Sequence, residues 1–139
     1  MSALWDQDPP SEGDIVWCHF PEEQDGSPGP KPRPALVIDV EVRTAGAVVS
    51  VIYGTSQRVT SLKSGEFAIS QSMNPDAYKL AGLSYDTKFN FRETAPLPWT
   101  EEFFKVPPRA PCGQRPKLGS LHVSLHRAAQ AAFNASKRR

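Results

Sequence analysis

An arginine lies between two prolines at the start of a hydrophobic run, in the segment KPRPALVI of residues 31–38. A proline disfavours the helical region for the residue before it, so Pro34 biases Arg33 toward extended backbone. A guanidinium held in this way presents five donors in a planar fork, which suits a phosphate or a carboxylate. The alternative is that Arg33 only pairs with a surface acid, because most exposed arginines do no chemistry.

A polar segment led by a glycine follows a later hydrophobic run and contains Thr55, Ser56 and Gln57. Polar segments directly after a buried strand are typical of functional loops on a rigid scaffold. The hydroxyl of Thr55 could donate to a phosphate oxygen, and Ser56 and Gln57 could add hydrogen bonds to phosphate or to base edges. For Thr55 the structural alternative is a cap at the end of the strand.

Cationic and aromatic residues near these two segments would suit a single-stranded nucleic acid, which needs both charge and stacking surfaces. Lys31 and Arg58 could line the path of a phosphate backbone, and the alternative for both is a solvated surface residue. Trp17, Phe20 and Tyr53 lie near the same loops along the chain, and we interpret each as a core residue rather than a stacking platform.

The sequence assigns no general base and predicts no metal or cofactor. Arginine stays protonated and is a poor base. His19 ends the first expected strand and is interpreted as exposed and uninvolved, whereas His122 and His126 have an i, i+4 spacing that can bind metal but no evident third ligand. We therefore expect His122 and His126 to face solvent.

Cys18 and Cys112 are too few and too distant for a zinc site or a disulfide scaffold, and Cys18 is expected to be a small buried hydrophobe.

The 139-residue length suits one domain with a single core, and the net charge of +1 means that any nucleic-acid contact must come from a local patch. We expect residues 1–12 to be a loosely ordered lead-in, 13–136 to be the domain and 137–139 to be a basic tail. The start of the chain does not resemble a secretion signal, and no apolar run approaches the roughly 20 residues that cross a bilayer. We therefore expect a cytoplasmic protein.

Hydrophobic patterning predicts short strands, a small helix and a terminal helix. Residues 35–42 alternate in polarity, which predicts a half-buried strand with Leu36, Ile38, Val40 and Val42 on its buried face. The other expected elements are strands at 15–20 (covered on both faces), 47–53, 66–69 and 83–91, a helix at 75–81, a proline-rich segment at 97–117 with a short strand or docking segment at 103–106, and a helix at 121–135. This order predicts an α+β, mainly β domain, most simply a curled, barrel-like sheet.

The terminal helix is expected to pack on the sheet through one apolar stripe. Ser120 is the expected cap at its start. The residues of the stripe fall on one face at helical spacing: Leu121, Leu125, Ala128, Ala132 and Phe133.

Three segments together resemble the PemK/MazF family of toxin endoribonucleases. These are GDIV at 13–16, KPRPALVI at 31–38 after a glycine- and proline-rich loop, and YGTSQ at 53–57. The segment LGSL at 118–121, leading into the last helix, also resembles that family. The resemblance covers residues 12–58 well and 118–134 moderately.

This resemblance implies a small SH3-like barrel of the MazF/CcdB type, a homodimer, and metal-free cleavage of single-stranded RNA at short sequences. It places the functional arginine of the family on Arg33 and its functional threonine on Thr55. It also implies inhibition by a cognate antitoxin, for which we expect an acidic and apolar segment, and DNA binding through the antitoxin complex. Two other functions stay open: a binding toxin of the same fold that poisons a protein such as DNA gyrase, and a catalytically silent nucleic-acid-binding barrel.

The chain departs from the family pattern at three places. The loop before Arg33 is long, acidic and proline-rich, and Gly54 precedes Thr55 where proline is common in relatives. An extended proline-rich segment also precedes the last helix. We expect these departures to affect loop conformation and sequence preference more than the fold.

Overall fold

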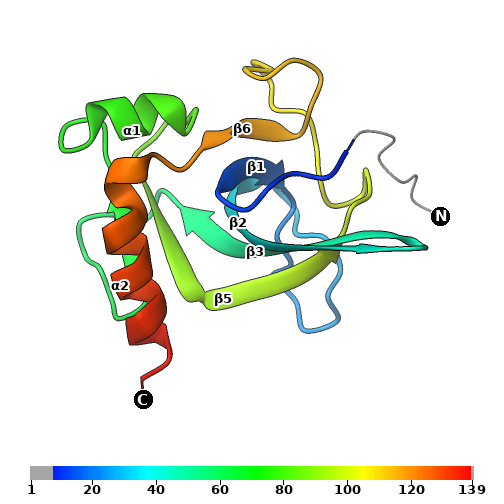
Figure 1. The fold of residues 1–139 in the computed structure, drawn as a ribbon, viewed down its shortest axis with the longest axis horizontal. Coiled ribbons are helices and arrows are strands. Elements are labelled where there is room, and N and C mark those ends of the chain that lie inside the picture. Colours follow the sequence, from blue (N-terminus) through cyan, green and yellow to red (C-terminus); the bar gives the residue numbers. More distant parts are fainter. Residues whose placement is uncertain (1–7, 139) are drawn as a thin grey trace.

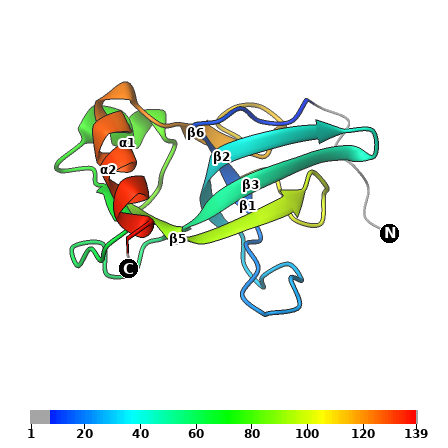
Figure 2. The same ribbon diagram turned by 60° about the horizontal axis from the view of Figure 1, so that its bottom comes forward.

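The computed structural model describes residues 8–138, so part of the expected lead-in and the last residue of the expected basic tail lie outside the described residues. The polypeptide forms one curled sheet with two α-helices at one end (Figures 1 and 2). The elements in chain order are β1 Asp14–Cys18, β2 Arg33–Arg43, β3 Gly46–Thr55, β4 Glu66–Ile69, α1 Pro75–Leu80, β5 Thr87–Pro98, β6 Lys117–Ser120, the 3-10 turn η1 Val123–Leu125 and α2 His126–Ser136.

The six strands are all antiparallel and lie in the order β4-β5-β3-β2-β1-β6. The register between β3 and β5 shifts after Ile52, which pairs with Thr94, so that Tyr53 pairs with Asn90. An irregularity of this kind bends a strand and increases its twist. The curled sheet confirms the expected α+β, mainly β class. None of the described helices is long and apolar enough to cross a membrane.

Both faces of the central strands are buried, as predicted for β1. Neighbouring residues Ile15 and Val16 are both fully buried, but they belong to two different hydrophobic clusters. One cluster lies under the helices, and the other is closed by Phe103 and Phe104 of the proline-rich segment. The expected short strand at 103–106 is thus a docking segment with a single β-bridge, from Phe104 to Cys18.

The predicted single buried face of β2 is wrong. The register with β3 shifts between Val37 and Asp39, so Ile38 lies at a bulge. Leu36 and Ile38 pack with the cluster under the helices, whereas Val40 packs with the other cluster. Val42 is 76% exposed because it lies next to the hairpin turn, beyond both clusters.

The predicted strand at 83–91 is displaced along the chain. β5 begins only at Thr87 and continues through two prolines to Pro98. Those prolines are tolerated because β4 pairs only with residues 87–90, so the second half of β5 has β3 on one side alone and needs no N–H toward the other. Residues 83–86 form a turn instead of a strand.

The start of the terminal helix is also corrected. Ser120 belongs to β6, where it pairs with Asp14 of β1, so it does not cap a helix. His122 caps the 3-10 turn η1 that precedes α2, because its side chain accepts a hydrogen bond from the Ser124 backbone N–H at 3.0 Å, whereas Leu125 at the start of α2 makes no side-chain cap. His122 and His126 therefore do not share one α-helical face, because α2 itself begins at His126.

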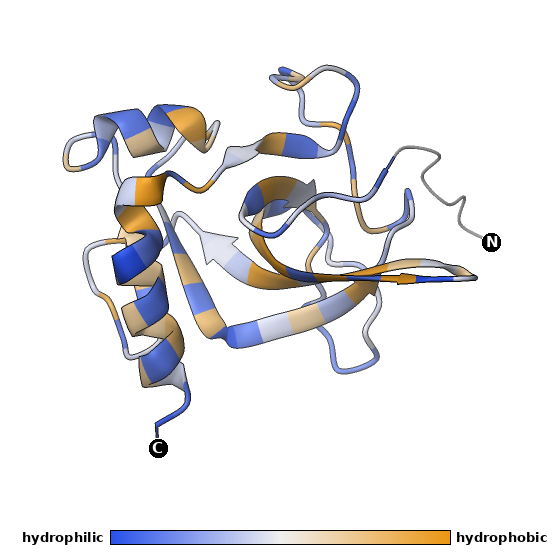
Figure 3. Cartoon of the chain, in the orientation of Figure 1, coloured by the Kyte–Doolittle hydropathy of each residue, from blue (hydrophilic) through white to orange (hydrophobic). Residues whose placement is uncertain are grey.

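The apolar stripe of α2 is rotated relative to the prediction, because the helix begins later. Ala129 is buried in place of Ala128, and Phe133 is 38% exposed. Leu125 and Ala132 are buried as predicted. Hydrophobic and hydrophilic residues alternate around α2, as expected of a helix with one face on a sheet (Figure 3).

Candidate active site

Arg33 and Thr55 lie at one edge of the sheet, where β2 begins and β3 ends. Ala35 pairs with Tyr53 in this antiparallel ladder, so continuing the register places Arg33 opposite Thr55. Both residues line the same cavity, with a volume of about 690 Å³. The structure therefore brings together the two residues that the sequence analysis singled out.

The walls of this cavity come from segments that are far apart in the chain. The start of β2 and the end of β3 form one side. The other walls are α1 with the turn that follows it and the prolines of residues 107–111, while Trp17 of β1 also lines the space. Trp17 is half-buried and packs against the hydrophobic cluster under the helices, which agrees with its interpretation as a core residue, and it also lines the cavity. Phe20 is buried, with its ring edge toward Tyr53 at 5.2 Å between centroids.

The guanidinium of Arg33 is held without a counter-ion. Its Cζ lies 5.8 Å from the centre of the Tyr53 ring, and its Nε is buried without a hydrogen-bond partner. Among residues 8–138, no carboxylate forms an ion pair with Arg33. The alternative of pairing with a surface acid is therefore not what the structure shows. Because a buried donor without a partner is costly, this guanidinium is suited to accept an anion.

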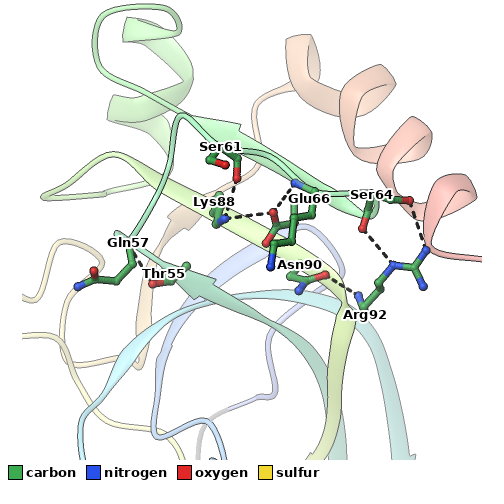
Figure 4. Close-up of polar contacts among 9 residues, drawn as sticks. Thr55, Gln57, Ser61, Ser64, Glu66, Lys88, Asn90 and Arg92 are labelled. Atoms are coloured by element: carbon green, nitrogen blue, oxygen red, sulfur yellow. Dashed lines mark hydrogen bonds and ion pairs between the residues drawn. The ribbon is translucent and has the colours of Figure 1, made fainter.

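The hydroxyl of Thr55 has a structural role as well as a place in the cavity. Its Oγ1 accepts a hydrogen bond from the Gln57 backbone N–H at 3.1 Å, which is the strand-end cap considered above (Figure 4). A hydroxyl that accepts one hydrogen bond still has its own proton to donate. Thr55 can thus cap the strand and donate into the cavity at the same time.

Gly54 has a steric reason to precede Thr55. A Cβ at this position would lie 2.5 Å from the carbonyl oxygen of Pro34 and 2.8 Å from the Phe89 ring. Contacts this short do not occur with a real side chain, so only glycine lets β3 approach β2 this closely beside Arg33. The packing at this edge of the sheet therefore requires glycine at position 54, where proline is common in relatives.

A buried ion pair lies next to Thr55 on the neighbouring strand, and the sequence analysis missed it. Lys88 pairs directly opposite Thr55 between β3 and β5. Its Nζ lies 3.1 Å from Glu66 Oε1 and 3.1 Å from the Ser61 carbonyl oxygen, and both side chains are 7% exposed (Figure 4). These contacts fix the loop after Thr55 to β5. The available signal was a lysine directly before Phe89, within a segment predicted to be a strand.

Arg92 holds the other end of that loop to α2. Its guanidinium donates to the Ser64 carbonyl at 3.0 Å (Figure 4). The same group donates to the Ala135 carbonyl at 3.1 Å. It also donates to the carbonyl of Arg138 at 3.0 Å. A cation is stabilising at the C-terminal end of a helix, where carbonyl groups are otherwise unpaired.

The other predicted site residues separate into two groups. Ser56 lines the cavity with Thr55, whereas Lys31, Gln57 and Arg58 are exposed and outside its lining. His19 is also outside the lining, and its Nδ1 lies 2.8 Å from the Gly29 carbonyl oxygen, so it is involved in holding the long loop before β2. Within residues 8–138, no group of three or more potential metal-ligating side chains lies close together.

Sequence reasoning also missed two cations on the far walls of the cavity. Lys79 of α1 and Arg109 of the proline-rich segment both line the space, and no carboxylate of the described residues does. Tyr78 lines it as well, and its pKa is raised, first by burial and then by the negative charge of Asp86. No local motif marks these residues, because only the fold places them near Arg33.

Comparison with known families confirms the resemblance stated above. Residues 11–89, more than half of the 139-residue chain, match the model of the PemK-like, MazF-like toxins of type II toxin–antitoxin systems. This range contains Arg33, Thr55 and the buried Lys88–Glu66 pair. A comparison with curated proteins finds no match. The chain belongs to the PemK-like, MazF-like toxin family of type II toxin–antitoxin systems, which implies an antitoxin partner.

Proposed function

We propose that this toxin is a metal-independent endoribonuclease that cleaves single-stranded RNA at short sequences. The observation that supports this most is the unpaired guanidinium of Arg33 beside the hydroxyl of Thr55 in one cavity. Members of this family are generally toxin endoribonucleases, so membership favours the same conclusion.

In this reaction the 2′-OH of the substrate loses its proton as its oxygen attacks the adjacent phosphorus. The bond from phosphorus to the 5′-oxygen breaks, a 2′,3′-cyclic phosphate forms, and the leaving oxygen takes up a proton. Arg33 stabilises the charge that develops on the non-bridging oxygens, and in a site shielded from water this is often the largest catalytic contribution. Thr55 donates to the phosphate and orients the 2′-OH.

The exposed residues around the cavity are proposed to guide the rest of the RNA. Lys31 and Arg58 contact neighbouring phosphates, and Ser56 and Gln57 donate to phosphate or base edges. Of these, Ser56 is the residue with a place in the cavity lining. We expect Lys31 and Arg58 to affect affinity more than the rate of the chemical step.

The test is cleavage of a mixed RNA pool in the presence of EDTA, with sequencing of the fragment ends. Arg33→Ala should fold normally but lose about 10² to 10³ in rate, the typical effect of removing one charge-stabilising donor. Arg43→Ala is the matched control, because Arg43 ends the same strand that Arg33 begins. Cleavage by Arg33→Ala at the parental rate would contradict the proposal, and retained toxicity without RNA fragments would favour a protein-poisoning toxin.

The antitoxin is proposed to inhibit through an acidic and apolar segment. A carboxylate of that segment would occupy the phosphate position at Arg33, while apolar side chains contact the prolines and aromatic rings of the cavity walls. Isolation of an inhibitory segment that is neutral or basic would contradict this.

The homodimer and the cytoplasmic location implied by the resemblance are also proposals. Sedimentation of the purified toxin tests whether it is a homodimer.

A further inference from the structure

The proline-rich segment before β6 forms one wall of the candidate active site, although it lies outside the residues that match the family. The match ends at residue 89, and the segment that reaches the cavity is residues 107–111. In Figure 1 this segment loops over one end of β6, and α1 lies at the other end. The segment is thus a property of this chain that the family match does not explain.

The segment is anchored to β1 before it reaches the cavity. Phe103 and Phe104 are buried in the hydrophobic cluster on that side of the sheet. The His19 backbone N–H donates to the Phe103 carbonyl at 2.7 Å, and the Lys105 N–H donates to the Trp17 carbonyl at 3.0 Å. Prolines in the cavity wall restrict the backbone further, because each fixes its own φ. The wall is therefore preorganised.

Arg109 lies on this wall and contributes a positive charge to the cavity lining. It is exposed, and no carboxylate of residues 8–138 forms an ion pair with it or with Lys79. The positive charge of Arg109 acts on the Tyr78 hydroxyl, and the opposing charge of Asp86 acts on the same group. The Asp86 carboxylate accepts a hydrogen bond from the Gln71 N–H at 2.8 Å and keeps its negative charge, but it lies outside the cavity lining. The lining itself contains Lys79 and Arg109 and no carboxylate of the described residues, so the far side of the cavity is cationic.

An aromatic ring lies on the same side of the cavity with most of its surface free. Tyr85 lines the space and is 72% exposed, so its ring is accessible to a ligand in the cavity. Bases of single-stranded nucleic acids stack on exposed aromatic rings while cations neutralise the phosphates. Tyr85 with Lys79 and Arg109 has both components.

We propose that Arg109, Lys79 and Tyr85 form a second nucleotide subsite, which holds the nucleotide adjacent to the one at Arg33. This inference rests on the proposed function, since it names how the same cavity binds its RNA. The cavity volume of about 690 Å³ is within the roughly 300 to 1,000 Å³ of small-molecule sites and exceeds the space that one phosphate needs. Arg109 contacts the phosphate of the second nucleotide, and its base stacks on Tyr85.

The test measures binding separately from cleavage. A fluorescent pool of single-stranded 2′-O-methyl oligonucleotides cannot be cut through a 2′-OH, and its anisotropy reports affinity for the full-length protein. Arg109→Gln should weaken binding about tenfold, as expected for a lost hydrogen bond to a charged group. It should also lower the dependence of log affinity on log salt by about 0.7. Arg115→Gln is the matched control, because Arg115 lies exposed on the same segment outside the cavity.

A second pair of variants tests the stacking surface. Tyr85→Leu should weaken binding about tenfold, whereas Tyr85→Phe should bind like the parent because its ring still stacks. Equal affinities of Arg109→Gln and Arg115→Gln would overturn the subsite, as would absence of binding by the parent. Weaker binding of Arg109→Gln to an acidic peptide but not to the oligonucleotides would also overturn it, and would assign this wall to a protein partner. Failure of the parent to cut RNA, with these binding results intact, would overturn only the proposed reaction.

Discussion

β2 begins and ends with an arginine, and the two ends of this strand differ in almost every other respect. Arg33 lies over the Tyr53 ring with a buried, unpartnered Nε. Arg43 at the far end, next to the hairpin turn, pairs with Glu41 at 2.9 Å, and the two side chains are 56% and 57% exposed. Figure 2 shows the hairpin turn extending away from the helices, whereas the other end of the strand lies near them.

Residue type alone does not decide what an arginine does. At the turn, water and a nearby carboxylate satisfy the guanidinium, and an exposed pair of this kind contributes little to stability. At the site, walls from α1 and from the proline-rich segment exclude much of the water around Arg33. Electrostatic interactions with an anion are stronger where the effective dielectric is low.

The largest effect should come from breaking the buried ion pair beside Thr55. Lys88→Met leaves the Glu66 carboxylate buried without its partner, which typically costs about 3 to 5 kcal/mol of unfolding free energy. Urea denaturation measures this directly. Arg43→Met, which breaks the exposed pair at the turn, should leave the midpoint unchanged.

The double variant Lys88→Met/Glu66→Leu removes both buried charges and should recover much of the lost stability. Equal stability of Lys88→Met and the parent would mean that the two ends of the hairpin are held in the same way. That result would mean that the buried ion pair beside Thr55 contributes no more to stability than the exposed Arg43–Glu41 pair at the turn.

A smaller effect is expected from adding a methyl group at the site end of β3. Gly54→Ala pushes a Cβ against the Pro34 carbonyl and should cost about 1 to 3 kcal/mol, the usual range for overpacking. It should also slow RNA cleavage, because the displaced backbone holds Arg33. Gly46→Ala is the control at the turn end, where φ is +122°. It should lower stability without lowering the cleavage rate per folded molecule.

The smallest effect concerns Cys18, which pairs with Arg33 between β1 and β2. Burial raises the pKa of this thiol from 9.0 to about 12. Between these values the unfolded chain releases a proton that the folded protein keeps, so stability falls as pH rises. The loss should be about 1.4 kcal/mol per pH unit above pH 9.

The loss of stability caused by the Cys18 thiol is measured by comparing the urea midpoints of the parent and of Cys18→Ala from pH 8 to pH 10.5. The difference between them should shift with pH in favour of the variant, since alanine has no proton to lose. A constant difference would show that water reaches the site end of β2 as readily as it reaches the turn.

Local sequence predicted the strands well where a single pattern decided the structure. The strands expected at 35–42, 47–53 and 66–69 lie where predicted, and α1 begins at Pro75 as predicted, whereas the strand expected at 15–20 ends at Cys18. The errors have one cause, which is competition from the rest of the chain. Prolines in β5 are tolerated at an unpaired edge, and pairing with β1 places Ser120 in a strand instead of at a helix start.

By itself, the sequence determined the extended backbone at Arg33, through the proline that follows it, and the polar segment at Thr55. These are local effects of steric restriction and side-chain chemistry. Only folding leaves Arg33 without a carboxylate partner among residues 8–138, pairs Lys88 with Glu66 beside Thr55, and brings Lys79 and Arg109 to the cavity that Arg33 lines. Charges far apart in a chain interact only when folding brings them close and removes the water between them.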